Sequence, residues 1–149
     1  MSAGSVYDVA GGRTAFLALA AALHERCVAD PVLSHPFSHG FSEDHLEHLA
    51  DYLGEVFGGP PVYSDLGGHS VMLNIHASTG ADEDMANRFL LCFDLAVADA
   101  GLAEDAALRQ VLHDYMAWAT NEVNEYSPLG SVVPEALAFP RWSWDGPVR

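Results

Sequence analysis

Apolar side chains recur with the period of an α-helix along most of this 149-residue chain. Between Thr14 and Val28 they fall three and four residues apart, which places them on one helical face. Similar stripes span residues 42–57, 82–100 and 104–125, and a shorter helix is expected over residues 68–77. We find no convincing strand pattern, fixed-period repeat or low-complexity tract. The periodicity therefore predicts an all-α fold built from amphipathic helices.

Capping and breaking residues indicate where these helices begin and end. Thr14 and Ser42 are expected to act as N-caps, because a side-chain oxygen can accept a hydrogen bond from a free amide of the first turn. Pro31 should end the first long helix, since it lacks a backbone donor and restricts the residue before it. The Gly-Gly-Pro-Pro segment at 58–61 is expected to end the preceding helix abruptly, and residues 62–68 are predicted to form an ordered loop.

The charge balance excludes several classes of partner. Twenty-one acidic residues stand against six basic ones, a formal charge of −15. A surface that negative repels the phosphates of nucleic acids and of anionic membranes. The longest apolar run, from Ala15 to Leu23, is too short for the ~20 residues of a membrane span. We therefore expect a cytoplasmic protein that binds neither nucleic acid nor membranes.

Histidine is the residue type most suggestive of chemistry, because it is both a common metal ligand and a proton switch near neutral pH. Of the eight histidines, His45 and His48 lie three residues apart on one predicted helix and could share a metal ion. The same stretch is also typical of a solvated helix start. His76 ends a largely apolar segment, so it could be a buried histidine bonded to a carbonyl or an axial ligand of a flat apolar cofactor such as haem.

Several motifs in order resemble the group II truncated haemoglobins. Gly58-Gly59-Pro60, Tyr63-Ser64, Gly68-His69 and then His76 are similar to the signature of that family. The opening Tyr7-Asp8 with Gly11-Gly12, and the link Asp30-Pro31-Val32-Leu33, resemble it too, so that the likeness covers roughly residues 6–128.

The resemblance implies a two-over-two helical sandwich around non-covalent haem b (iron protoporphyrin IX). His76 would take the place of the proximal iron ligand, with its other ring nitrogen free to hold a carbonyl. The globin domain would then span residues 1–128. Residues 129–149, with several prolines and two tryptophans, would form an irregular C-terminal extension outside the resemblance.

On the distal side the chain departs from the family pattern. His24 stands where the family usually has a tyrosine, and Phe89 where a tryptophan typically donates a hydrogen bond. Phe37 resembles the ring-stacking phenylalanine of ordinary globins, while His45 falls at the distal position with Leu49 one turn further along. The resemblance thus implies that imidazoles replace the usual donor network. An imidazole N–H would stabilise bound dioxygen by about a kcal/mol or more, could move protons, or could ligate the iron itself.

The family's basic residues before the proximal histidine are missing here, so His69, Tyr63 or Arg13 would have to meet the haem propionates. The residues that the resemblance places around the cofactor are Phe37, Leu49, Phe57, Tyr63, His69, Met72 and Phe89.

These features predict a haem protein that binds dioxygen or another diatomic gas. His24 and His45 would be its catalytic groups if it turns over nitric oxide or peroxide, as an NO dioxygenase or a peroxidase-like enzyme with a redox partner would. Two alternatives stay open: a haem-free helical module that uses the fold for protein contacts, and a non-haem metal protein using His45 and His48. The C-terminal extension is compatible with a homodimer.

Overall fold

Four long helices form the body of the molecule, and two of them cross the other two. The computed structural model describes residues 4–34, 44–65, 67–77, 82–135 and 137–148, with the side chains of Ile75 and His76 left outside that description. Its elements are α1 (Val6–Ala10), α2 (Gly12–Ala29), α3 (His45–Val56), α4 (Val62–Asp65), α5 (His69–His76), α6 (Glu83–Asp99), α7 (Ala106–Glu125), β1 (Trp142–Ser143) and β2 (Gly146–Pro147).

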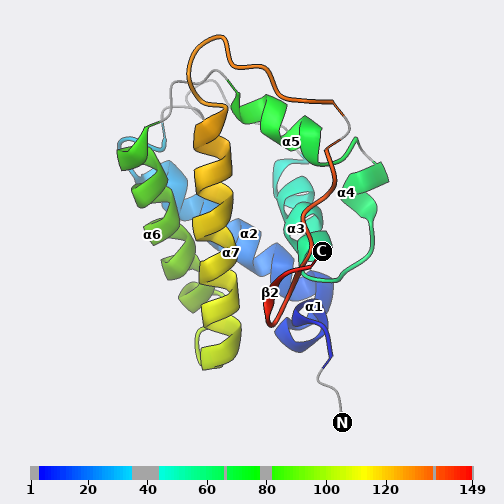
Figure 1. The fold of residues 1–149 in the computed structure, drawn as a ribbon. Coiled ribbons are helices and arrows are strands. Elements are labelled where there is room, and N and C mark those ends of the chain that lie inside the picture. The colour runs from blue at the N-terminus through cyan, green and yellow to red at the C-terminus, as the bar shows by residue number, and fades with distance from the viewer. Residues whose placement is uncertain (1–3, 35–43, 66, 78–81, 136, 149) are drawn as a thin grey trace.

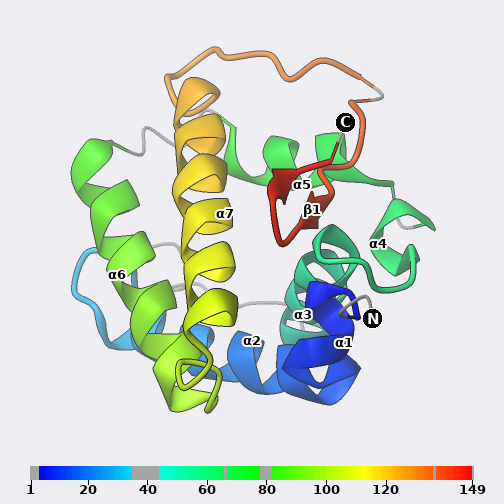
Figure 2. The same ribbon diagram turned by 60° about the horizontal axis from the view of Figure 1, so that its bottom comes forward.

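Helix α2 is the centre of the architecture, since it packs against both α3 and α6, and α6 in turn packs along α7 (Figures 1 and 2). The pair α2 and α3 therefore lies across the pair α6 and α7. This arrangement confirms the predicted all-α, two-over-two sandwich. None of the helices in the described ranges has the length and apolar character needed to cross a lipid bilayer.

The predicted apolar stripes meet in one core. On α2 the buried positions recur at the spacing that predicts a helix, and on α6 a second stripe faces them. Aromatic rings link the layers: Phe57 lies 6.0 Å from Phe16 and 5.2 Å from Tyr115, measured between ring centroids. The buried residues of the two stripes are Phe16, Leu19, Ala20, Leu23 and Cys27 on α2, and Cys92, Phe93, Ala96 and Val97 on α6.

Thr14 and Ser42 are the two predicted N-caps. Thr14 is not the N-cap of α2: the helix begins earlier, at Gly12, directly after Gly11 in the left-handed region at φ 119°. That geometry suits glycine, which lacks a Cβ, and it also ends α1. Ser42 lies outside the described residues, and Asp44 occupies the position before α3.

Two local predictions are wrong. Residues 62–65, expected in a loop, form the single turn α4, which follows Pro61 and is too short to show a periodic stripe. A two-stranded antiparallel hairpin, β1 with β2, also forms near the C-terminus. Strands of two residues show no detectable alternation of apolar and polar positions.

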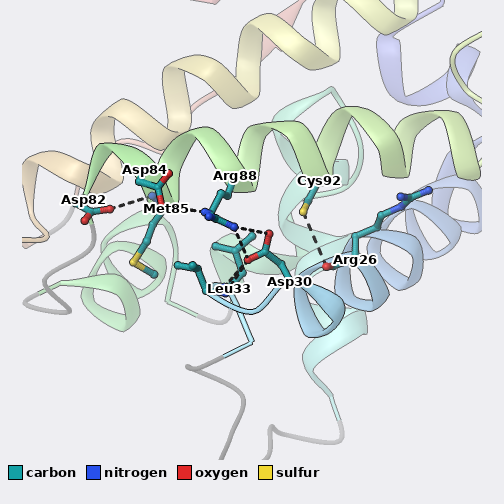
Figure 3. Close-up of polar contacts among 9 residues, drawn as sticks. Arg26, Asp30, Leu33, Asp82, Asp84, Met85, Arg88 and Cys92 are labelled. Atoms are coloured by element: carbon teal, nitrogen blue, oxygen red, sulfur yellow. Dashed lines mark hydrogen bonds and ion pairs between the residues drawn. The ribbon is translucent and has the colours of Figure 1, made fainter.

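Polar groups fasten the α2–α6 contact at its rim (Figure 3). The carboxylate of Asp30 accepts hydrogen bonds from the amides of Val32 and Leu33 and from the guanidinium of Arg88 on α6. Nearby, Arg26 forms a bidentate pair with Asp99, at 2.7 and 2.8 Å. The segment that directly follows α2 is therefore bound to α6 as well as to the core.

The segment after α7 does not project from the molecule but returns across it (Figure 1). Ser70 on α5 donates to the carbonyl of Pro134 and accepts from the amide of Leu137. Further along, the indole of Trp144 donates to the carbonyl of Gly4, 140 residues earlier. The segment thus ties α5 and the N-terminus to the rest of the fold, and residues 127–148 are called the tail below.

Candidate functional site

Helix α5 carries His76 as its last residue and lies outside the two crossed helix pairs. The helix begins at His69 after Gly68 and ends at His76. Across the described residues, α5 makes no extensive backbone contact with any other helix. It is held instead by side chains, with Leu73 fully buried and Met72 packed against the core. The side chain of His76 lies outside the described part of the structure.

The two distal histidines predicted from the sequence come together. His24 on α2 and His45 on α3 have ring centroids 5.3 Å apart with their planes inclined by 62°. Both side chains are half-buried. His24 lies one residue after Leu23 and four after Ala20, which are both buried. This position on α2 turns its side chain toward the interior.

His45 and His48, the alternative metal pair, lie in different environments. His48 is exposed on α3, whereas His45 is half-buried next to His24. No group of three or more histidine, cysteine, aspartate or glutamate side chains in the described ranges is arranged to hold a metal ion. These findings do not favour the non-haem metal hypothesis.

Three of the predicted cofactor-binding residues share one property. Leu49 on α3, Met72 on α5 and Phe89 on α6 are large apolar side chains that pack against the core and remain only half-buried. They come from three different helices. Phe37, predicted to stack on the cofactor, lies outside the described residues.

The other predicted cofactor-binding residues contact protein groups. Phe57 is fully buried between Phe16 and Tyr115. The ring of Tyr63 packs edge-on against Tyr52 with centroids 5.0 Å apart.

His69 takes part in a buried hydrogen-bonded chain. Its Nδ1 lies 2.8 Å from the hydroxyl oxygen of Tyr52, and its Nε2 lies 2.6 Å from Oε1 of Glu122 on α7. The Tyr52 hydroxyl also interacts electrostatically with that of Tyr115, and burial raises the pKa of both phenols well above their ordinary value. Sequence reasoning missed Glu122, because it lies 53 residues from His69 in a polar stretch that shows no motif.

Comparison with known proteins decides the family. The pattern of the bacterial-like globins matches residues 5–121. This chain belongs to the bacterial-like globin family. The globin is 30% identical to a thermostable haemoglobin from Thermobifida fusca, over 89% of this chain and all of that one, with a TM-score of 0.67. It is 28% identical to the haemoglobin of Chloroflexus aurantiacus, over 81% of this chain and 98% of that one, with a TM-score of 0.71.

The same fold occurs in the group II truncated haemoglobin of Bacillus anthracis. That protein is 19% identical to this globin over 81% of this chain and 96% of its own, with a TM-score of 0.72. The resemblance found in the sequence is thereby confirmed, and membership of the globin family implies a haem.

The described residues fit such a group. The half-buried apolar side chains of Leu49, Met72 and Phe89 offer surface that the core leaves uncovered, which is typical of a wall for an apolar ligand. The imidazoles of His24 and His45 carry nitrogen donors suited to iron or to a ligand of iron.

Partners for the haem propionates are less evident, since two of the three groups proposed for them, His69 and Arg13, contact other side chains. Both ring nitrogens of His69 are hydrogen bonded. Arg13 lies 3.4 Å from Asp51, although its side chain is half exposed and can reorient.

A separate cavity of about 320 Å³ lies between α5, α7 and the tail. Its lining includes the buried His69, the half-buried Glu122 and Arg141. Three aromatic side chains also line this space. It is called the tail cavity below. The aromatic lining residues are Trp118, Phe139 and Trp142.

Proposed function

We propose that this globin holds one haem b through His76 and binds diatomic gas ligands on the side of His24 and His45. The observation that supports the proposal is the contact of those two imidazoles, 5.3 Å apart between ring centroids, in a chain that belongs to a globin family. When bound, the haem would supply an iron with an exchangeable position for a gas ligand.

The apolar side chains would hold the porphyrin. Leu49, Met72 and Phe89 would contribute apolar surface to a flat group and would help to exclude water from the iron. Phe37 is proposed to stack on the ring. Water exclusion strengthens every hydrogen bond made to the ligand, because the local dielectric falls.

The distal imidazoles would set the ligand preference. A gas ligand that carries partial negative charge would accept a hydrogen bond from an N–H of His24 or His45, which would stabilise it. Phe89, which stands where a tryptophan donor is usual in the family, cannot contribute such a bond. The two histidines also offer a second outcome, in which one of them binds the iron and competes with the gas.

We further propose that the protein turns over nitric oxide or peroxide. An imidazole that can release and accept a proton is the group that such chemistry needs beside the ligand. A redox partner would have to return electrons to the iron.

Titration of the purified chain with haemin tests the assignment. We expect one haem per chain, with a Soret band that survives dialysis. His24→Leu and His45→Leu should each retain the haem but release dioxygen faster, by roughly fivefold for the loss of a hydrogen bond of about 1 kcal/mol. His48→Leu, an exposed histidine on the same helix, is the matched control. Failure to take up haem would overturn the proposal in favour of the haem-free module.

A further inference from the structure

The hydrogen-bonded chain Tyr52–His69–Glu122 supplies a buried phenol with a built-in proton acceptor. Tyr52 is only 5% exposed, so bulk water cannot take its proton. Its hydroxyl oxygen lies 2.8 Å from Nδ1 of His69, and Nε2 of that ring lies 2.6 Å from the carboxylate of Glu122. All three groups come from different helices, so the fold itself builds this arrangement.

The hydrogen-bond donors and acceptors of these three side chains allow a proton to move from one to the next. When the Tyr52 hydroxyl donates to Nδ1, a neutral imidazole carries its proton on Nε2 and donates it to Glu122. Loss of one electron makes a phenol strongly acidic. The Tyr52 proton then passes to Nδ1 as the Nε2 proton passes to Glu122, which leaves a neutral tyrosyl radical and a neutral carboxylic acid. No unpaired charge is created in the interior, where it would be costly.

Aromatic rings connect this phenol with the surface. Tyr115, whose hydroxyl interacts electrostatically with that of Tyr52, lies 5.7 Å from Trp142 and 6.1 Å from Trp118 between ring centroids. Trp118 is 37% exposed, and both tryptophans line the tail cavity. Electrons can therefore travel between the cavity wall and Tyr52 through rings in near contact.

We propose that Tyr52 is a redox-active tyrosine, oxidised by hydrogen peroxide acting at the cofactor and reduced again by a small phenol at the tail cavity. The inference rests on the proposed function only for the source of its oxidant. In one step Tyr52 gives one electron to the oxidant and its proton to the His69–Glu122 pair. In the next, a phenol gives one electron through Trp118 and Tyr115 and releases its own proton to solvent, while the stored proton returns to Tyr52.

Two such cycles balance the reaction. One hydrogen peroxide takes up two electrons and two protons and becomes two waters, and two phenols become two phenoxyl radicals. The tail cavity, at about 320 Å³, has the size of a small-molecule site and is lined by aromatic rings on which a phenol can stack.

Photochemical oxidation tests the redox activity of Tyr52 without relying on haem. A ruthenium tris-bipyridine flash-quench applied to the full chain as isolated should produce a tyrosyl radical visible by electron paramagnetic resonance. The signal should be lost in Tyr52→Phe and retained in Tyr63→Phe. Tyr63 is the matched control, since its ring lies 5.0 Å from that of Tyr52 and is also buried.

A second variant tests the role of the proton acceptor without changing the fold. In Glu122→Gln the amide oxygen can still accept from Nε2 but cannot take up its proton, so the radical signal should fall while the circular dichroism is unchanged. Glu125→Gln, exposed on the same helix, should have no effect. A signal that survives Tyr52→Phe, or that falls equally in Tyr63→Phe, would overturn the proposal.

Peroxide added to the haem-loaded protein tests the oxidant. The same Tyr52-dependent signal should form and should decay faster when phenol is present, and Trp118→Leu should abolish that acceleration. If the chain takes up no haem, the proposed function fails while the ruthenium experiment still decides whether Tyr52 is redox-active. If haem binds and peroxide gives no Tyr52 signal, peroxide is excluded as the oxidant and the proposal is overturned.

Discussion

Arg141 of the tail pairs with Glu55 at the end of α3, with the guanidinium and carboxylate 3.3 Å apart. Glu55 is completely buried, whereas the Arg141 side chain is 46% exposed. The same carboxylate accepts hydrogen bonds from the backbone amide of Ser64, at 2.9 Å, and from its hydroxyl. One buried acid therefore joins α3, α4 and the tail.

Replacing that acid should destabilise the protein. Glu55→Ala leaves the Ser64 amide without its acceptor and removes the partner of Arg141. We expect the free energy of unfolding to fall by about 1–3 kcal/mol, the usual cost of an unsatisfied buried polar group. Urea denaturation measures it, and Glu125→Ala, exposed on α7, should change the value by less than about 0.5 kcal/mol. Equal effects of the two variants would show that Glu55 does not join these segments.

The tail should hold α5 through the hydroxyl of Ser70. Ser70→Ala removes the bond to the Pro134 carbonyl, at 2.9 Å, and the bond from the Leu137 amide, at 3.0 Å. We expect faster hydrogen exchange at Leu137 and a loss of roughly 1 kcal/mol in stability. Because α5 ends in His76, the rate of haem loss should rise as well. Ser131→Ala is the control, since the Ser131 hydroxyl donates to Pro128 within the tail itself. Unchanged exchange at Leu137 would contradict this role.

Asp30 should make stability depend on pH in the acid range. Hydrogen bonds from the amides of Leu33 and Val32, together with Arg88, lower the pKa of its carboxyl in the folded state (Figure 3). The ionised form is therefore favoured by folding. Its stabilising contribution is complete above the unfolded value of about 3.9 and is lost as the pH falls through the lower folded pKa.

The variant Asp30→Asn isolates this contribution. The difference in unfolding free energy between wild type and variant should be constant at neutral pH and should shrink in acid. Glu104→Gln, an exposed carboxylate between α6 and α7, serves for comparison. A difference that stays constant down to pH values below the unfolded pKa would show that Asp30 gains nothing from these bonds.

The two cysteines should be unreactive in the folded protein. Burial raises the pKa of the Cys27 thiol to about 12 and also raises that of Cys92. Because the thiolate is the nucleophile, a disulfide reagent at pH 8 should label neither residue at an appreciable rate. Both should react at once in denaturant. Fast labelling of one thiol in the native state would mean that the α2–α6 contact opens readily.

The sequence predicts the helical body well because local periodicity encodes it. The stripes of α2 and α6 are evident from spacing, and the proximity of His24 and His45 follows once the fold class is known. Pro31 signals the end of α2, which the structure places at Ala29, but no sequence signal shows that the helix begins at Gly12 and not after Thr14.

Long-range side-chain partners are what the sequence does not reveal. His69 is predicted to face a propionate, yet Tyr52 and Glu122 take both of its ring nitrogens. Likewise, the tail is predicted to be irregular, and its order depends on contacts such as that of Trp144 with Gly4, which no local pattern encodes. Such pairs are set by how the helices pack.

The visible absorption spectrum of the purified protein, compared with that of His76→Gly, tests the central claim most directly. We predict that the wild type gives a Soret band that shifts on reduction and again with carbon monoxide. The variant should lose the ferrous spectrum of a nitrogen-ligated haem and regain it when imidazole is added. A variant whose spectra equal those of the wild type would show that His76 does not bind the iron.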